Sequence, residues 1–94
     1  MIFTDVIGEV HHIGQVQRLG ADGNFMKLTV IIKTVSNTPQ FYPVDFINDA
    51  IKMTEELEEG RNTNIKCSIR GSMSKKKDDN RAFINLNAFK INED

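Results

Sequence analysis

The segment IRGSMSKKKDDNRAFINL, residues 69–86, places three consecutive lysines between two runs in which apolar and polar residues alternate. Alternation with a period of two is typical of β-strands, so the lysines should form the tip of a hairpin. Clustered cations can neutralise the phosphates of a nucleic acid. A charged tip of this kind is most often only a solvated turn, and Asp78 and Asp79 follow the lysines directly. Taken alone, the segment leaves both roles open.

The distribution of charge bears on this choice more than the total charge does. A net charge of −1 argues against a nucleic-acid partner, but it is a cancellation between segments. Residues 44–60 carry six acids against one lysine, a net charge of −5. Residues 61–90 carry eight basic residues against two acids, a net charge of +6. The lysines therefore belong to a strongly basic stretch of the chain.

Catalytic and metal-binding patterns are not found in the sequence. It has no paired nucleophile and base, no Gly-rich phosphate loop and no carboxylate cluster with metal-ligand spacing. His11 and His12 are neighbours on an expected strand, so they point to opposite faces and cannot chelate one metal together. Cys67 is the single cysteine and is expected to be reduced and buried. We expect no enzyme activity, no cofactor and no bound metal.

Length and composition indicate one small globular domain over residues 1–94. Hydrophobic residues make up 39% of the chain and charged residues 27%. The sequence has no apolar run long enough for a membrane span, and MIFTDVIGEV lacks the features of a signal peptide. These observations predict a cytoplasmic protein with no membrane partner.

The first half of the chain predicts three strands. Residues 2–18 form a long first strand, in which Gly8 and Gly14 allow a sharp bend or a bulge. A turn at 19–24 leads into a second strand at 25–36, whose even-numbered residues Met26 to Ile32 form one apolar face. Residues 41–47 form a short third strand with Phe46 in the core, and Pro43 there indicates an edge position or a bulge.

The second half predicts one helix and two more strands. Apolar residues recur at helical intervals from Ile47 to Leu57; Asn48 and Asp49 suit the start of a helix, and Gly60 suits its end. The runs NTNIKCSIRGSM and RAFINLNA then alternate as strands four and five. The parity of the apolar residues changes after Ala88, which predicts either a bulge there or a packing role for the outer end of the strand.

This order of elements predicts an all-β protein, a five-stranded Greek-key barrel of the OB-fold type with one helix between strands three and four. An SH3-like barrel is the competing architecture. A helix of about three turns after the third strand favours the OB-fold, because SH3-like barrels typically carry only a short 3₁₀ turn late in the chain.

The segment YPVDFINDAIKMTEELEEGRNTNIKCSIRGSM resembles the passage from third strand through helix to fourth strand in the single-stranded DNA-binding protein family of bacteria and their phages. FTDVIGEV is similar to that family's Gly-containing first strand, and DNRAFINLNAFKI to its last strand. The resemblance is one of pattern and order over nearly the whole chain. The short chain is more similar to small phage-type or accessory members.

The resemblance implies binding of single-stranded DNA with little sequence preference, in DNA replication, recombination or repair, in the cytoplasm of a bacterial or phage-infected cell. RNA is an alternative ligand. It also implies a homodimer or homotetramer, for which Ile7, Ile31 and Phe89 are candidate contacts, and replication proteins as further partners.

Binding to single strands needs cations for the phosphates and aromatic faces on which bases stack, and OB-folds place both on strands two and three and the adjoining loops. The candidate nucleic-acid-binding residues are Arg18, Phe25, Lys27, Lys33, Phe41, Tyr42, Arg70, Lys75, Lys76, Lys77, Arg81 and Phe83. Several of them have a purely structural alternative: Phe25 and Phe83 could be core or interface residues, and Tyr42 or Phe41 could pack inside the barrel.

The alternative function is an OB-fold adaptor that binds another protein of a replication or primosome complex. Such a surface would use the same aromatic residues without needing the lysines. The two functions differ in salt dependence, since only phosphate neutralisation makes affinity fall steeply with salt.

Overall fold

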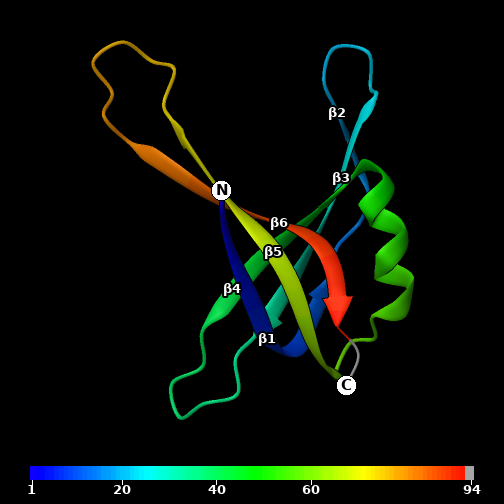
Figure 1. The fold of residues 1–94 in the computed structure, drawn as a ribbon. Helices are drawn as coiled ribbons and strands as arrows, with labels where there is room; N and C mark the ends of the chain where they lie inside the picture. The colour runs from blue at the N-terminus through cyan, green and yellow to red at the C-terminus, as the bar shows by residue number, and fades with distance from the viewer. Residues whose placement is uncertain (93–94) are drawn as a thin grey trace.

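The computed structural model describes residues 1–92. Within this range the chain forms six strands and one helix (Figure 1). The elements are β1 (Ile2–Ile13), β2 (Gln17–Leu19), β3 (Phe25–Lys33), β4 (Phe41–Ile47), the helix η1 (Asn48–Glu56), β5 (Asn62–Met73) and β6 (Ala82–Asn92).

Five of the strands close into a barrel. β1 pairs with β5, β5 with β6, β6 with β4, β4 with β3, and β3 returns to β1. All these pairs are antiparallel except β4 with β6, which is parallel. β2 lies outside this ring and forms a hairpin with β3. This is the predicted OB-fold with its helix between the third and fourth barrel strands.

The predicted first strand, residues 2–18, is two strands in the structure. β1 pairs with β5 from Ile2 to Glu9 and with β3 from Glu9 to Ile13, with a register shift between Val10 and His12. An added Cβ on Gly8 would lie 2.3 Å from the carbonyl oxygen of Lys33, and one on Gly14 would lie 2.8 Å from that of Thr29. The two glycines were expected to allow a bend or a bulge; in the structure they permit the close backbone approach that closes the barrel, and the chain leaves the β1 ladder after Ile13.

The core lies inside the ring and matches the predicted apolar faces. Leu28, Val30 and Ile32 of β3 are buried, and Met26 at the end of the same face is half-buried. Phe46 is fully buried, as predicted. The other buried hydrophobic residues are Val6, Val10, Val44, Ile65, Cys67 and Ala88. The helix η1 packs Ala50, Ile51 and Met53 against this core, and Leu57, directly after the helix, packs there too.

The helix is confirmed, but its start differs from the expectation. It is of the 3₁₀ type, and neither Asn48 nor Asp49 caps it; the residue before it is Ile47, which makes no side-chain capping bond. Asn48 instead has a positive φ of 50°, and its Oδ1 accepts a hydrogen bond of 2.8 Å from the backbone N–H of Met26. Its side chain therefore fixes the helix to β3. The helix ends at Glu56, earlier than the expected Gly60; the backbone N–H of Gly60 donates instead to the carbonyl of Val10 at 2.8 Å, which returns the chain to β1.

The parity change in the last strand is a bulge. Lys66 pairs with Lys90 and Cys67 with Ala88, so Phe89 is the extra residue. Beyond the bulge Ile91 packs against the core, while Phe89 stays half-exposed, its ring centroid 5.5 Å from that of Phe3. Pro43 lies outside the two residues through which β4 pairs with β6, so of its two predicted roles the edge position holds.

Cys67 is buried and has a free thiol, as predicted. Burial, and then the negative charge of Asp5, raises the pKa of this thiol to about 11. No helix in residues 1–92 has the length and apolarity needed to cross a bilayer.

Candidate nucleic-acid interface

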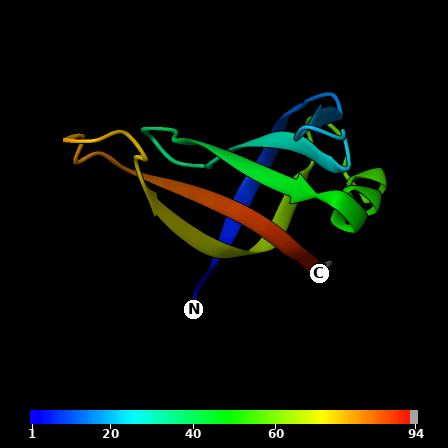
Figure 2. The ribbon, with the colours of Figure 1, turned by 90° about the horizontal axis from the view of Figure 1, so that it is seen from above.

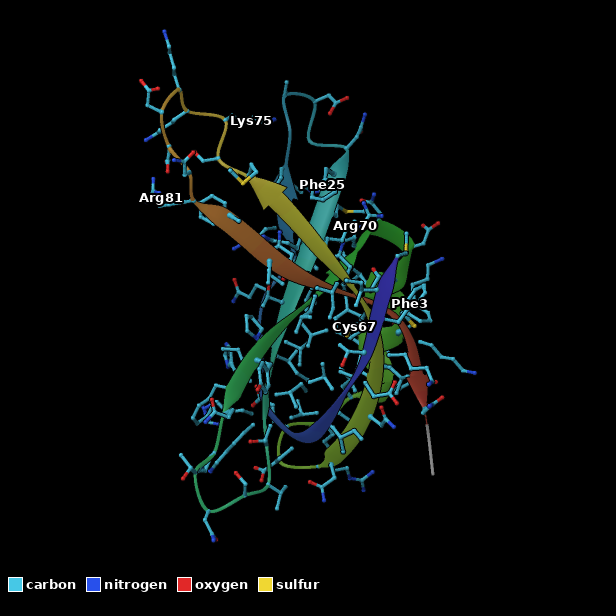
Figure 3. The ribbon with its side chains drawn as sticks, turned by 60° about the vertical axis from the view of Figure 1, so that its left-hand side comes forward. Phe3, Phe25, Cys67, Arg70, Lys75 and Arg81 are labelled. Atoms are coloured by element: carbon cyan, nitrogen blue, oxygen red, sulfur yellow. The ribbon has the colours of Figure 1, made fainter. Side chains whose placement is uncertain are left out.

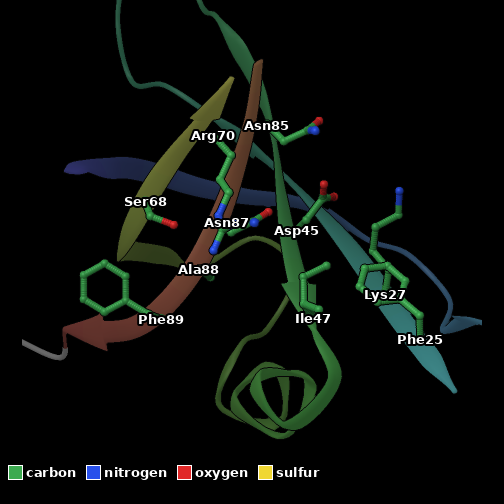
Figure 4. Close-up of a pocket in the computed structure, with 10 residues that line it drawn as sticks. All are labelled: Phe25, Lys27, Asp45, Ile47, Ser68, Arg70, Asn85, Asn87, Ala88 and Phe89. Carbon is green, nitrogen blue, oxygen red and sulfur yellow. The ribbon is translucent and has the colours of Figure 1, made fainter. Parts of the chain in front are cut away.

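A groove of about 560 Å³ runs across the outer face of β3, β4, β6 and β5 (Figure 4). Outward-facing side chains of all four strands line it, because residues that pair directly across strands share a face. The groove therefore lies on the closed barrel, where strand pairing fixes the positions of its side chains.

Two phenylalanines stand on opposite sides of this groove. Phe25 begins β3, and Phe89 is the bulged residue of β6; their exposed fractions are 42% and 50%. Figure 4 shows the two rings with the polar residues between them. Phe25 was a predicted binding residue, whereas Phe89 was expected only as a contact between subunits. The change in parity after Ala88 was the feature of the sequence that could have placed Phe89 outside the core.

The cations of the groove are Lys27 on β3 and Arg70 on β5, both predicted from the sequence. Arg70 is exposed and pairs in register with Asn85 of β6. Figure 4 shows the Arg70 side chain extending over β6 toward Asn87. A polymer lying between the two aromatic rings would therefore meet a positive charge from each side.

The floor between the rings is polar. Thr29, Asp45, Asn87 and Ser68 pair in register across four strands, so they form one row on the outer face. The hydroxyl of Thr29 donates a hydrogen bond of 2.6 Å to Oδ1 of Asp45. None of these four was a predicted site residue. Alternation alone gives their outward direction, but the row depends on strand registers that the sequence does not reveal.

The β5–β6 hairpin carries the same face beyond the barrel. Phe83 pairs with Ser72, and it shares the face of the Arg70–Asn85 pair because it lies two residues along the strand. We call residues 74–81 the lysine arm; it bears exposed Lys75, Lys76 and Lys77. Figure 1 shows this loop and the β2–β3 loop projecting from the same end of the molecule, and Figure 2 shows them separated across its width.

Within the lysine arm, Asp79 forms an ion pair with Arg81 and not with any of the three lysines. The Arg81 guanidinium lies 2.7 Å from Oδ2 of Asp79, and the Ser74 hydroxyl donates to the same oxygen at 2.9 Å. Hydrogen bonds, chiefly those from Arg81 and then the one from Ser74, lower the pKa of Asp79 to about 2. In turn, the hydrogen bond to the Asp79 carboxylate raises the pKa of Arg81. Within residues 1–92, no ion pair involves Lys75, Lys76 or Lys77. Figure 3 shows Arg81 at the base of the arm.

The remaining predicted residues lie elsewhere. Lys33 pairs with Phe41 at the far end of β3, about 20 Å along the strand from Lys27. The ring of Phe41 packs edge-on against His11, with centroids 5.1 Å apart. Arg18 pairs with Met26, so it lies on the face of the β2–β3 hairpin opposite to Phe25 and Lys27. These three are not brought together with the groove.

Tyr42 lies on the core-side parity of β4 and is 41% exposed. It lines a separate cavity of about 420 Å³ with Val6, Ile69 and Leu86 among others. Its ring is therefore neither inside the closed core nor on the face of the groove.

His12 contacts the acidic residue Glu59. His12 Nδ1 lies 3.5 Å from Oε2 of Glu59, an oxygen that also accepts the backbone N–H of Ile13 at 2.8 Å. In the described part of the chain, no three His, Cys, Asp or Glu side chains gather where they could hold one metal ion.

Three solved structures share this fold. The mitochondrial single-stranded DNA-binding protein Rim1 of S. cerevisiae matches with a TM-score of 0.76 at 14% identity, over 97% of this chain and 92% of that one. The SSB domain of a protein from Synechococcus sp. matches with a TM-score of 0.72 at 11% identity, over 99% of this chain and 96% of that one. The small single-stranded DNA-binding protein of Streptomyces coelicolor matches with 0.61 at 15% identity, over 99% and 92%. At such identities the likeness establishes the fold.

No curated protein matches the sequence. Residues 5–92 match the model of the family described as Domain of unknown function (DUF3127), and the chain belongs to this family.

Proposed function

We propose that this member of the DUF3127 family binds single-stranded DNA with little sequence preference. The observation that carries the proposal is the groove itself, in which two exposed phenylalanines and two cations from different strands face the same space. Structures of the same fold include proteins named for single-stranded DNA binding, which supports this choice of ligand.

The binding geometry follows from the chemistry of the lining. Unstacked bases settle on Phe25 and Phe89, and each such stack is worth about 1–3 kcal/mol whatever the base. Lys27 and Arg70 neutralise phosphates beside the bases. The strand then continues along the β5–β6 hairpin past Phe83 to the lysine arm, whose three lysines have no acidic partner within residues 1–92.

One groove provides only a short binding site, so we propose that the protein acts as a homodimer or homotetramer. A DNA strand bound in one groove is then present at a high effective concentration for the groove of the next subunit. Ile7 is 61% exposed on β1 and Ile31 is half-buried on β3; both suit a contact between subunits. The proposed setting is DNA replication, recombination or repair in the cytoplasm of a bacterial or phage-infected cell, with replication proteins as partners.

The test is a fluorescence anisotropy titration of labelled oligo-dT with the protein over a series of salt concentrations. For single strands, the logarithm of the affinity should fall against the logarithm of salt with a slope of about −0.7 for each phosphate neutralised. Two to five contacts would therefore give a slope of about −1.4 to −3.5. Absence of binding at low salt with micromolar protein would reject the proposal.

The second candidate, an adaptor that binds another protein, is favoured by a different surface. Ile84, Met73 and Ile2 are 72%, 57% and 66% exposed, and they continue the core-facing side of the β1–β5–β6 sheet beyond the barrel. A protein ligand held by these apolar side chains would bind with little dependence on salt. Salt-insensitive binding to a partner protein, together with no binding to oligo-dT, would select this candidate.

A further inference from the structure

We propose that Asp45 biases one position of the groove toward bases that carry an exocyclic amino group. This inference rests on the proposed function, because it assigns a base preference to the same groove. Stacking on Phe25 and Phe89 accepts every base, so the bias is one of base composition within an otherwise tolerant site.

Asp45 is the acidic residue of a groove whose other charges are positive. It lies on β4 between Thr29 of β3 and Asn87 of β6, with which it pairs in register. Figure 4 shows its carboxylate on the groove side of β4, between Lys27 and Asn87. The carboxylate is thus placed in the floor, where the ligand passes from one phenylalanine to the other.

The carboxylate is oriented but not neutralised. The Thr29 hydroxyl donates to Oδ1 at 2.6 Å, which fixes the side chain. Oδ2 accepts no hydrogen bond from residues 1–92, and Asp45 makes no ion pair in that range, although Lys27 lines the same groove. A ligand therefore meets an acceptor-only group with free lone pairs and a negative charge.

This charge decides which side of the nucleic acid faces the floor. A phosphate would be repelled by Asp45 and attracted by Lys27 and Arg70, so the backbone runs beside the cations and base edges point to the floor. There the carboxylate accepts hydrogen bonds from amino groups such as N4 of cytosine, N6 of adenine or N2 of guanine. Thymine offers two carbonyl oxygens on either side of a single N–H, and both oxygens repel the carboxylate.

The experiment compares oligo-dC with oligo-dT of equal length by fluorescence anisotropy at neutral pH and one fixed salt concentration. A hydrogen bond to a charged group is worth about 1.5–3 kcal/mol, so the wild-type protein should bind oligo-dC at least about tenfold more tightly. In Asp45→Asn the amide keeps an acceptor for Thr29 and gains a donor that suits the thymine carbonyls. The ratio of the two affinities should therefore fall to about one or below.

Asp49→Asn is the matched control, because it removes one negative charge from an exposed position on η1 outside the groove. It should leave the ratio of affinities unchanged, and so separates base readout from a general gain in attraction to phosphate. Circular dichroism and the melting temperature show whether each variant is folded.

A preference of the wild-type protein for oligo-dC that Asp45→Asn removes and Asp49→Asn preserves supports the inference. Equal binding of both oligomers, tighter binding of oligo-dT, or an equal change of the ratio in both variants overturns it while leaving single-strand binding in place. Failure to bind either oligomer rejects the proposed function, and this inference with it.

Discussion

In the groove, each ring and cation stands on a strand of the closed barrel, whereas the three lysines of the arm stand on a turn held together by hydrogen bonds of its own residues. The groove is thus pre-organised for contacts that depend on geometry, such as stacking. The arm offers charge at the end of long flexible side chains, whose ordering costs entropy. We expect the groove to set the affinity for bases and the arm to set the dependence on salt.

The largest effect should come from adding one methyl group where the barrel closes. In Gly8→Ala the new Cβ would lie 2.3 Å from the Lys33 carbonyl oxygen, so β1 and β3 must move apart. The free energy of unfolding should fall by about 1–3 kcal/mol or more, because overpacking against backbone cannot be relieved by a rotamer change. Urea denaturation followed by circular dichroism measures this loss.

Gly71→Ala is the matched change in the β5–β6 hairpin beyond the barrel. Its Cβ would lie 3.9 Å from the Phe83 carbonyl oxygen, an ordinary contact, and its φ is not positive. The free energy of unfolding should therefore change by less than about 1 kcal/mol. Equal losses at Gly8 and Gly71 would contradict the view that the barrel is closely packed and the β5–β6 hairpin beyond it is not.

The next effect separates stacking from charge. Phe25→Ala removes one of the two rings of the groove and no charge, so the affinity for oligo-dT should fall by about 1–3 kcal/mol at every salt concentration. The slope against salt should stay the same. Phe41→Ala is the control, because Phe41 is also an exposed aromatic residue but lies with His11, away from the groove. A comparable loss in both variants would mean that the ligand does not follow the groove.

The sequence predicts the barrel well because the pattern that defines each strand, the alternation of apolar and polar residues, is local. Alternation gave the faces of β3 and β4, whereas the close approach of Gly8 to the Lys33 carbonyl became visible only in the structure. The start of the helix was predicted wrongly, since Asn48 was interpreted as a cap while its side chain bonds the backbone of Met26, a residue far away in the sequence. Local patterns do not contain such tertiary contacts.

The site was predicted less completely than the fold, for the same reason. Residue type was enough to select Phe25, Lys27 and Arg70, which the structure brings together. Asp45 and Asn87 enter the groove only through the parallel pairing of β4 with β6, and Phe89 only through a bulge. Arg81 was selected as a cation for phosphate, whereas its guanidinium already holds the carboxylate of Asp79.

A smaller effect is expected from the lysine arm. Changing Lys75, Lys76 and Lys77 together to Ala should make the slope of affinity against salt shallower by up to about 2, because each phosphate that the arm no longer neutralises removes about 0.7 from the slope. The affinity should fall at low salt and change little at high salt. Phe83→Ala, on the same hairpin, should weaken binding without altering the slope much. Equal slopes for these two variants would show that the arm does not contact phosphate.

The smallest effect concerns the ion pair that organises the arm. Hydrogen bonds in the folded state lower the pKa of Asp79 to about 2, so they stabilise the loop above the ordinary pKa of about 4 and are lost as the pH falls through 2. In Arg81→Leu, the pKa of Asp79 measured by NMR titration should rise toward its ordinary value, while Ser74 still donates to the carboxylate. Because Asp79 then keeps a negative charge that Arg81 no longer balances, the variant should bind oligo-dT more weakly than the wild-type protein. An unchanged pKa would mean that Arg81 does not hold Asp79. The carboxylate of Asp79 would then be free to compete with phosphate for the lysines of the arm.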